Sequence, residues 1–254
     1  MRQAVSASIK QAMISRGFLI SVLGVIMVLL LASIQDMLAA FRSAELVANG
    51  YHDSLIATAL GSEAMALALP ILCALPFTAT FVDDMKSGYI KAYLPRTARS
   101  EYIAGKAVGC AVSGGMALAL GILAAYGIAA LMFMPMEAPL AEGEKEIPYF
   151  KQLMETVLMF FASGAFWSLT GLTFATLTDS KYMAYASPFV LFYLLVILYE
   201  RYFDKLYILY PREWLNPSDK WVYGKVGVAV FLVELSVLMG LAFAAAAKRR
   251  LSRI

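Results

Sequence analysis

Six long apolar runs divide this sequence, and they constrain its fold more than any other feature. A helix needs about 20 consecutive apolar residues to cross the hydrocarbon core of a bilayer. Because lipid offers no water to backbone N–H and C=O groups, each run is predicted to be helical. The runs are residues 17–34, 63–82, 106–134, 153–178, 182–199 and 224–247. We therefore predict an all-α integral membrane protein with six transmembrane helices.

The composition agrees with lipid as the solvent of this chain. Hydrophobic residues make up 61% of the 254 positions and charged residues only 15%, whereas soluble domains average about 25% charged residues. The mean hydropathy is +0.71. The first run is long for the apolar region of a signal peptide, so we interpret it as a retained helix. One transmembrane domain is expected to occupy residues 1–254.

Basic residues are concentrated on one side of the predicted membrane. With the N-terminus inside, the inner segments contain these lysines and arginines: Arg2, Lys10, Arg16, Lys86, Lys91, Arg96, Arg99, Lys106, Lys181, Lys248, Arg249, Arg250 and Arg253. Only Asp83, Asp84, Glu101 and Asp179 oppose them on that side. Cytoplasmic segments carry an excess of lysine and arginine. Both termini are therefore predicted to be cytoplasmic, in the cytoplasmic membrane of a bacterial cell.

Three segments outside the runs have distinctive patterns. Residues 1–16 place apolar side chains at helical spacing among basic ones, which predicts an amphipathic helix on the inner membrane surface; a frayed basic tail is the alternative. Residues 200–223 are rich in tyrosine and tryptophan, which favour the headgroup level, so we expect short interfacial helices there. Residues 135–151 read as a solvated acidic loop because of four glutamates: Glu137, Glu142, Glu144 and Glu146.

The sequence contains no recognisable catalytic motif. It lacks G-x-x-x-x-G-K-[ST], G-x-S-x-G and H-E-x-x-H, so the chain is not expected to hydrolyse ATP by itself. His52 is the only histidine, which excludes a metal or haem site with several histidines. Cys73 and Cys110 lie inside apolar runs and are expected to be buried, reduced thiols. No metal site, catalytic residue or nucleic-acid partner is predicted.

The longest inner connection, residues 83–106, is the most informative segment. It places four residues on one face of a short helix: Tyr89, Ile90, Tyr93 and Leu94. Asp84 is expected to cap the start of this helix, and Pro95 limits its end. An apolar face displayed in the cytosol needs the membrane or the groove of a partner to cover it.

This loop resembles the connection between helices two and three of type-2 ATP-binding-cassette permeases. The likeness rests on the following pattern: Asp84-Met85-Lys86-Ser87-Gly88, then Tyr93-Leu94-Pro95, Arg96, Arg99, Tyr102 and Lys106. In that family an acidic residue and a glycine precede a leucine–proline turn, an arginine follows, and a lysine opens the third helix. Asp84 is a mild departure, because the family often has glutamate there. The pattern covers about a tenth of the chain, and the six-helix layout extends the likeness to the rest.

The resemblance implies the membrane-spanning subunit of an ATP-driven transporter, exporting an amphipathic or apolar cargo such as a peptide, drug or lipid-like molecule. ATP and magnesium would bind two copies of a separate ATPase subunit, and this chain would bind no cofactor. A second permease subunit, identical or paralogous, would complete the complex within the lipid. The residues implied in ATPase coupling are Asp84, Gly88, Tyr89, Ile90, Tyr93, Leu94, Arg96, Arg99 and Lys106. The alternative for the basic ones is contact with lipid phosphates.

The third run contains a stripe of small residues at every fourth position: Gly105, Gly109, Ser113, Ala117, Gly121, Ala125 and Ala129. Such residues let helices approach closely, either as static packing or as a sliding surface. Glu234 lies near the middle of the last run. A charge there costs roughly 2.5–3.5 kcal/mol, so it should face a partner or water. Glu234 could contact a cationic substrate, relay a proton, or remain protonated and hydrogen-bonded between helices.

Two other function classes fit the same sequence. A secondary transporter driven by an ion gradient would need several coupled polar groups near the midplane and broken helices, and the sequence alone offers one such charge, Glu234. A non-transporting membrane sensor or immunity protein needs neither feature. An intramembrane enzyme is disfavoured because no catalytic constellation is visible.

Overall fold

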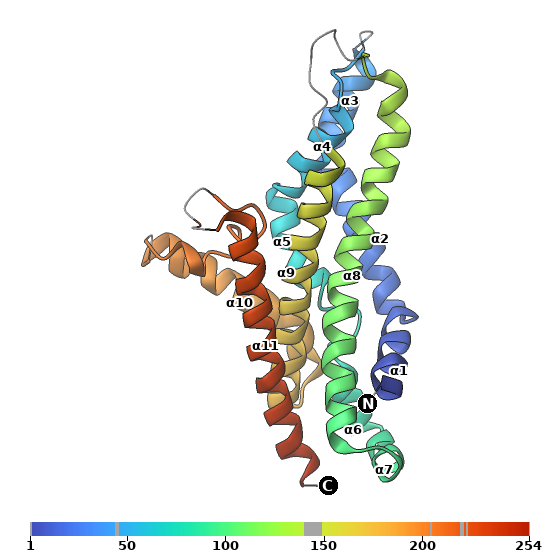
Figure 1. Cartoon of the computed structure of the whole chain (residues 1–254), viewed down its shortest axis with the longest axis vertical. Coiled ribbons are helices and arrows are strands. Elements are labelled where there is room, and N and C mark those ends of the chain that lie inside the picture. Colours follow the sequence, from blue (N-terminus) through green and yellow to red (C-terminus); the bar gives the residue numbers. More distant parts are fainter. Residues whose placement is uncertain are drawn as a thin grey trace.

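The computed structural model describes residues 2–43, 46–139, 149–203, 205–218, 221 and 223–253 as an elongated bundle of helices (Figure 1). The α-helices are α1 (Arg2–Met13), α2 (Arg16–Ala32), α3 (Ile34–Arg42), α4 (Tyr51–Leu60), α5 (Glu63–Leu72), α6 (Thr80–Lys86), α7 (Tyr89–Tyr93), α8 (Arg99–Phe133), α9 (Tyr149–Thr178), α10 (Lys181–Arg201) and α11 (Gly224–Leu251). Three 3₁₀ turns join them: η1 (Leu94–Arg96), η2 (Met134–Met136) and η3 (Tyr207–Leu209). Within these residues the only β pairing is an isolated bridge between Val47 and Glu137. The all-α prediction is confirmed.

Four helices are long and apolar enough to cross a membrane: α8 with η2, α9 from Lys151, α10 and α11. Two further pairs pass the same test only as bent units. The axes of α1 and α2 differ by 54° and those of α4 and α5 by 66°. Within the described residues there are therefore four candidate crossings, or up to six if each bent pair is one span. These helices indicate a membrane-embedded protein.

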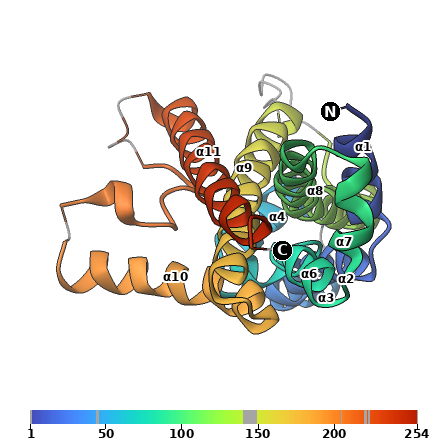
Figure 2. The same ribbon diagram turned by 90° about the horizontal axis from the view of Figure 1, so that it is seen from below.

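Different helices lie at the two ends of the bundle. α1, α6, α7 and the last turn of α11 lie at one end, and α3 and the end of α8 lie at the opposite end (Figure 1). We name these ends inner and outer after the orientation predicted from the sequence. Seen from below, α10 points away from the side that carries α1 and α2 (Figure 2). Both chain termini thus belong to the end that also carries the loop between α6 and α8.

The second predicted span, residues 63–82, is wrong as a continuous helix. The chain bends at Gly61, where α4 passes into α5, and it leaves helical geometry again over residues 73–79 before α6 begins. Pro70 and Pro76 contribute to this irregularity, because proline has no N–H to donate to the preceding turn. The bend at Gly61 lies just before the predicted span. Residues 64–82 carry no charged side chain, so the sequence pattern did not reveal the second interruption.

Two carbonyl groups around the second interruption accept hydrogen bonds from Ser21 of α2 and from Ser15, which caps α2. Ser21 Oγ donates a hydrogen bond of 2.7 Å to the carbonyl oxygen of Leu72, and Ser15 Oγ donates one of 3.1 Å to that of Pro76. An unsatisfied carbonyl in hydrocarbon costs several kcal/mol. Irregular backbone is therefore tolerated here because two serine hydroxyls of a neighbouring helix reach it.

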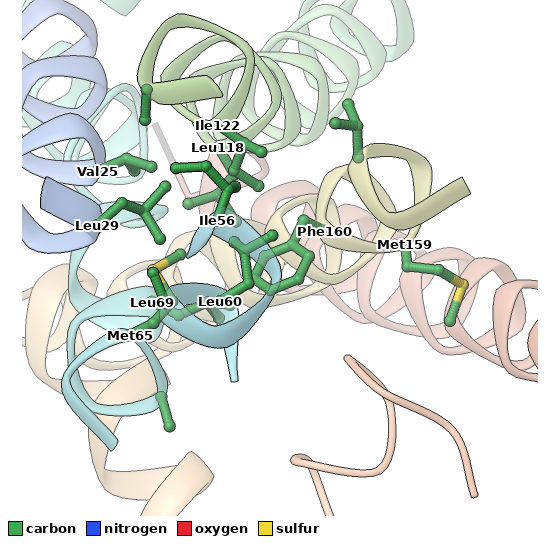
Figure 3. Packing of buried hydrophobic residues seen from close by; sticks show 14 of the residues in the cluster. Val25, Leu29, Ile56, Leu60, Met65, Leu69, Leu118, Ile122, Met159 and Phe160 are labelled. Carbon is green, nitrogen blue, oxygen red and sulfur yellow. The ribbon is translucent and has the colours of Figure 1, made fainter. Parts of the chain in front are cut away.

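The largest hydrophobic core of the described residues lies around the α4–α5 bend. Val25 and Leu29 of α2 point toward Ile56 of α4 and toward Leu118 and Ile122 of α8 (Figure 3). The side chains of these five residues are at most 1% exposed. The bent pair is thus packed into the centre of the bundle.

The small-residue stripe of α8 winds around the helix and contacts two neighbouring helices, α1 and α2. Gly109, Ser113, Ala117, Gly121 and Ala125 are all buried. A Cβ added at Gly109 would lie 3.2 Å from Cβ of Ser8 in α1, and one added at Gly121 would lie 2.5 Å from Cβ of Val25 in α2. Close packing of helices therefore accounts for these glycines.

A second glycine contact, which the sequence stripe did not indicate, joins α8 to α9. A Cβ added at Gly114 would lie 2.9 Å from the carbonyl oxygen of Gly164. Beside it, Ser168 Oγ donates to the carbonyl oxygen of Cys110 at 3.1 Å. These two helices are the closest-packed pair at the centre of the fold.

The N-terminal segment is a helix that packs on the bundle, so the frayed-tail alternative is wrong for residues 2–13. Ala12 is fully buried and Ala4 is 8% exposed. Gly105 of α8 leaves room for this contact, since a Cβ there would lie 3.1 Å from the carbonyl oxygen of Ala4.

The outer loop, residues 200–223, differs from the prediction of short interfacial helices. In its described part only η3 is helical, and the rest forms turns. Trp214 is 2% exposed; its ring lies 5.8 Å from that of Trp167 in α9 and its Nε1 donates to the carbonyl oxygen of Ile208 at 2.8 Å. The loop thus inserts a tryptophan into the bundle, and that anchor fixes its irregular path.

Candidate functional site

The loop between α6 and α8 reverses the chain at the inner end. Gly88, which precedes α7, has φ +74°. A side chain in this left-handed region costs roughly 1–2 kcal/mol, so the turn favours glycine. Pro95 lies in η1, and α8 begins at Arg99. The predicted short helix is present but has only five residues.

A buried ion pair braces this loop from behind. Lys106 Nζ lies 2.8 Å from Asp84 Oδ2, and the hydroxyl of Tyr102 donates to the same oxygen at 2.7 Å. The Lys106 side chain is 4% exposed and its Nζ lies 4.7 Å from the ring centroid of Phe77. The expectation that Asp84 caps the short helix is wrong, because it belongs to α6 and binds α8. Asp84 and Lys106 therefore fix the position of α6 relative to α8.

The apolar face of the short helix is covered by the chain itself. Ile90 is 1% exposed and lies in the inner core with Phe81 and Phe243. Tyr93 and Leu94 pack partly against that core. The premise that this face lacks a core of its own is therefore wrong. Sequence spacing identified the face but could not show that distant helices cover it.

The exposed part of this loop includes one aromatic and three basic side chains. Tyr89 is 49% exposed and stacks on the ring of Tyr93 at 5.4 Å. Lys86, Lys91 and Arg99 are also exposed. Partial burial, with Tyr93 and Asp84 nearby, raises the pKa of the Tyr89 phenol, which stays neutral at physiological pH. We call Lys86, Tyr89, Lys91 and Arg99 the loop surface; the side chain of Arg96 lies outside the described part.

Two further ion pairs tie the neighbouring helices together at this end. Lys181 at the start of α10 pairs with Asp83 of α6. Arg250 of α11 lies 3.0 Å from Asp179, and it also donates to the carbonyl oxygen of Leu177 at 3.1 Å. The inner ends of α6, α9, α10 and α11 are therefore connected by charge pairs in addition to apolar packing.

A cavity of about 370 Å³ lies beside the α4–α5 bend, toward the outer end. Such volumes are typical of small-molecule sites. Its polar lining includes Asp53, Glu63, Gln152, Arg212 and Lys225. Its apolar lining includes Ile56, Leu153, Met159, Phe160 and Leu215. The cavity is amphipathic, and the sequence did not predict it.

A loop segment covers this cavity and is held by an ion pair. Arg212 donates two hydrogen bonds to Glu63, of 2.6 and 2.7 Å, one to each carboxylate oxygen. Glu63 is the first residue of α5, so the pair joins the loop to the helix bend. Lys225 pairs separately with Glu155 at 3.0 Å.

A network of ionisable side chains surrounds His52 next to the cavity. His52 Nδ1 lies 2.5 Å from Glu137 Oε1. On its other side, Nε2 lies 3.2 Å from the Tyr126 hydroxyl and 3.3 Å from Asp53 Oδ2. The imidazole is thus placed between two carboxylates. Local sequence spacing could not predict this network, because His52 and Glu137 are 85 positions apart.

Glu137 is part of the fold, so the prediction that it lies in a solvated acidic loop is wrong. Its carboxylate accepts hydrogen bonds from the backbone N–H groups of Gly50, at 3.1 Å, and His52, at 3.0 Å. Burial raises the pKa of Glu137, but these bonds and the His52 side chain outweigh burial and lower it. The other three predicted loop glutamates, Glu142, Glu144 and Glu146, lie outside the described residues.

Glu234 is exposed on α11 and has no hydrogen bond or ion pair with any residue that the structure describes. The predicted option of a protonated Glu234 carboxyl group hydrogen-bonded to another helix of this chain is therefore not seen among the described residues. Among the same residues, no group of three or more His, Cys, Asp and Glu side chains is placed to hold a metal ion.

Comparisons of this chain with protein-family models, with curated proteins and with solved structures found no match. Its resemblance to type-2 ATP-binding-cassette permeases thus rests on the loop residues themselves.

Proposed function

We propose that this chain is the membrane-spanning subunit of an ATP-driven transporter, and that the loop surface contacts a separate ATPase subunit. The observation that carries the proposal is the combination of an exposed basic and aromatic surface on α7 with a buried brace behind it. A surface that only followed membrane topology would need no such brace. The exposed part provides contact, and the brace provides rigidity.

The contacts behind the loop offer a route for movement. Ile90 is embedded in the inner core together with Phe243 of α11, while Asp84 is bound to Lys106 of α8. Because packed cores move as units, force applied to α7 would be passed to α8 and α11. ATP and magnesium belong to the ATPase subunits in this proposal, and a second permease subunit completes the complex.

The outer cavity supports an amphipathic cargo. Phe160 and Met159 offer an apolar wall, and Arg212 and Glu63 offer charges at its edge. A cargo with one polar and one apolar part fits such a lining. We propose export, with peptides, drugs and lipid-like molecules as the cargo classes.

A second candidate function, transport driven by an ion gradient, is favoured by a specific observation. Broken helices and coupled ionisable groups are typical of secondary transporters, and the 66° bend of α4–α5 lies next to His52, Asp53 and Glu137. Under this proposal the His52 network would bind the driving proton. Transport that stops when the proton gradient collapses, yet continues without ATP, would support this second function.

The primary proposal is tested with Tyr89→Asp in the full chain, purified with a tag from its own cells so that any bound ATPase subunit is recovered with it. Tyr89 is half exposed, so the variant is expected to fold. We expect loss of ATPase co-purification, or ATP hydrolysis that no longer responds to cargo. Tyr223→Asp is the matched control, because Tyr223 is 79% exposed and precedes α11 at the opposite end of that helix. Unchanged coupling in Tyr89→Asp would refute the assignment of the loop.

A further inference from the structure

One face of α11 is left uncovered along the helix. Among the long helices α11 is the least buried. Its uncovered residues include Val226, Val230, Val233, Glu234, Val237, Leu238 and Leu241. They recur at intervals of three or four, which is the spacing of one helix face. We call these seven residues the exposed α11 face.

Glu234 belongs to this face and lies at a membrane depth where an ionised carboxyl group is costly. Glu234 is 10 residues after Gly224 and 14 before Lys248, which places it about 15 Å and about 21 Å from these positions. A span of this length leaves it near the middle of the hydrocarbon core. An ionisable group at that depth requires a partner, and no described residue of its own chain provides one.

The chemistry of the group points to a second copy of the same chain. A protonated carboxyl group is both donor and acceptor, so two such groups satisfy each other. Copies inserted with the same orientation hold Glu234 at the same depth. A two-fold axis along the membrane normal, with α11 facing α11, therefore brings the two carboxyl groups together.

Two other features of the chain favour this arrangement. The basic residues of α11 lie at its ends, at Lys225 and from Lys248 onward, so no cation of the second copy meets Glu234 when the helices pair in parallel. On the inner half of the helix, a Cβ added at Gly240 would meet nothing within 4 Å. Small residues allow close helix approach in membranes, and this one has space for a neighbour.

We propose that the chain self-associates through the exposed α11 face, with the two Glu234 carboxyl groups hydrogen-bonded to each other across the two-fold axis. This proposal specifies how the second permease subunit of the proposed function would contact the first. It rests on the proposed function only for the identification of that second subunit as another copy of this chain. It does not depend on the ATPase.

Cysteine cross-linking in native membranes tests the contact. Val237→Cys places a thiol one turn from Glu234, on a residue that is 55% exposed. Cys73 and Cys110 are buried and remain in place, so the unsubstituted protein serves as the blank. Leu23→Cys on α2 is the matched control, because Leu23 is 60% exposed on a different helix. We expect a product of twice the chain mass from Val237→Cys only.

Substitutions of Glu234 in the Val237→Cys background test the carboxyl pair. Glu234→Gln keeps a self-complementary donor and acceptor and should cross-link as well as Glu234. Glu234→Leu should weaken association about threefold to thirtyfold, the range for one interhelical hydrogen bond. Glu234→Lys should abolish the product, and co-expression with the Glu234 chain should restore a mixed dimer through opposite charges.

The proposal is overturned if Val237→Cys yields no product, if Leu23→Cys yields as much, or if the product contains a different polypeptide. It is also overturned if Glu234→Lys leaves the yield unchanged. The assay needs neither nucleotide nor cargo, so its failure is distinguishable from failure of ATPase coupling, which Tyr89→Asp decides.

Discussion

Two ion pairs, one at each end of this molecule, differ in how far they are buried. At the inner end, Lys106 is almost completely buried and has one carboxylate, Asp84, within ion-pair distance. At the outer end, Arg212 and Glu63 keep 30% and 78% of their side chains exposed at the edge of a cavity. A buried pair fixes the relation of two helices, whereas an exposed pair can open at low cost. The Asp84–Lys106 pair therefore holds α6 on α8, whereas the Arg212–Glu63 pair is expected to open easily at the edge of the cavity.

The largest effect is expected from removing one partner of the buried Asp84–Lys106 pair. Lys106→Met leaves Asp84 as a buried, unpaired charge and should reduce stability by about 3–5 kcal/mol. Thermal unfolding of the purified protein in detergent measures this loss. The double variant Asp84→Asn with Lys106→Met is the control, and it should recover most of the stability. Equal melting of Lys106→Met and the unsubstituted protein would show that the inner end is not braced.

The core that joins the two ends is tested by two glycines of α8. Gly121→Ala places a Cβ 2.5 Å from Cβ of Val25 and should cost about 1–3 kcal/mol through overpacking. Gly127→Ala is its matched control, because nothing lies within 4 Å of a Cβ there. That change should stabilise the helix by about 0.5–1 kcal/mol. If both variants melt alike, α2 does not pack on α8 as described.

The loop segment that covers the cavity is tested by Arg212→Ala. The exposed pair with Glu63 contributes at most about 1 kcal/mol, so its loss should leave folding intact but open the loop up to about fivefold more often. The rate of maleimide labelling at Leu215→Cys reports this opening. Lys225→Ala removes the other ion pair at the cavity and should leave the rate unchanged, since Lys225 is bound to α9 rather than to the loop. Equal rates in all variants would argue against a movable cover.

The smallest expected effect is a pH dependence at the outer end. The pKa of Glu137 is lowered in the folded protein, so its contribution to stability is present above the ordinary glutamate pKa of about 4.3. It is lost as the pH falls through the lower folded value. Melting curves between pH 6 and pH 3 should show a loss on the order of one hydrogen bond, about 1 kcal/mol. Glu137→Gln should remove that part of the pH dependence, and an unchanged profile would contradict it.

Apolar runs were enough to predict an all-helical membrane protein, because lipid forces long apolar segments to form helices. They did not reveal the break after α5, since residues 73–79 are as apolar as a helix. The hydrogen bonds from Ser21 to the carbonyl group of Leu72 and from Ser15 to that of Pro76 join residues far apart in sequence. The face containing Ile90 was visible from spacing, but its cover comes from distant helices. The cavity and the His52 network were missed for the same reason, as they arise from pairs such as Glu63 with Arg212.

The central claim, that the loop surface contacts an ATPase, is tested most directly by site-specific photo-crosslinking in intact cells. A photoreactive amino acid in place of the exposed Lys91 should capture a polypeptide with a nucleotide-binding P-loop, identified by mass spectrometry. The same amino acid in place of Tyr223 should not. Adducts at position 91 that contain only lipid, or no protein, would contradict the account.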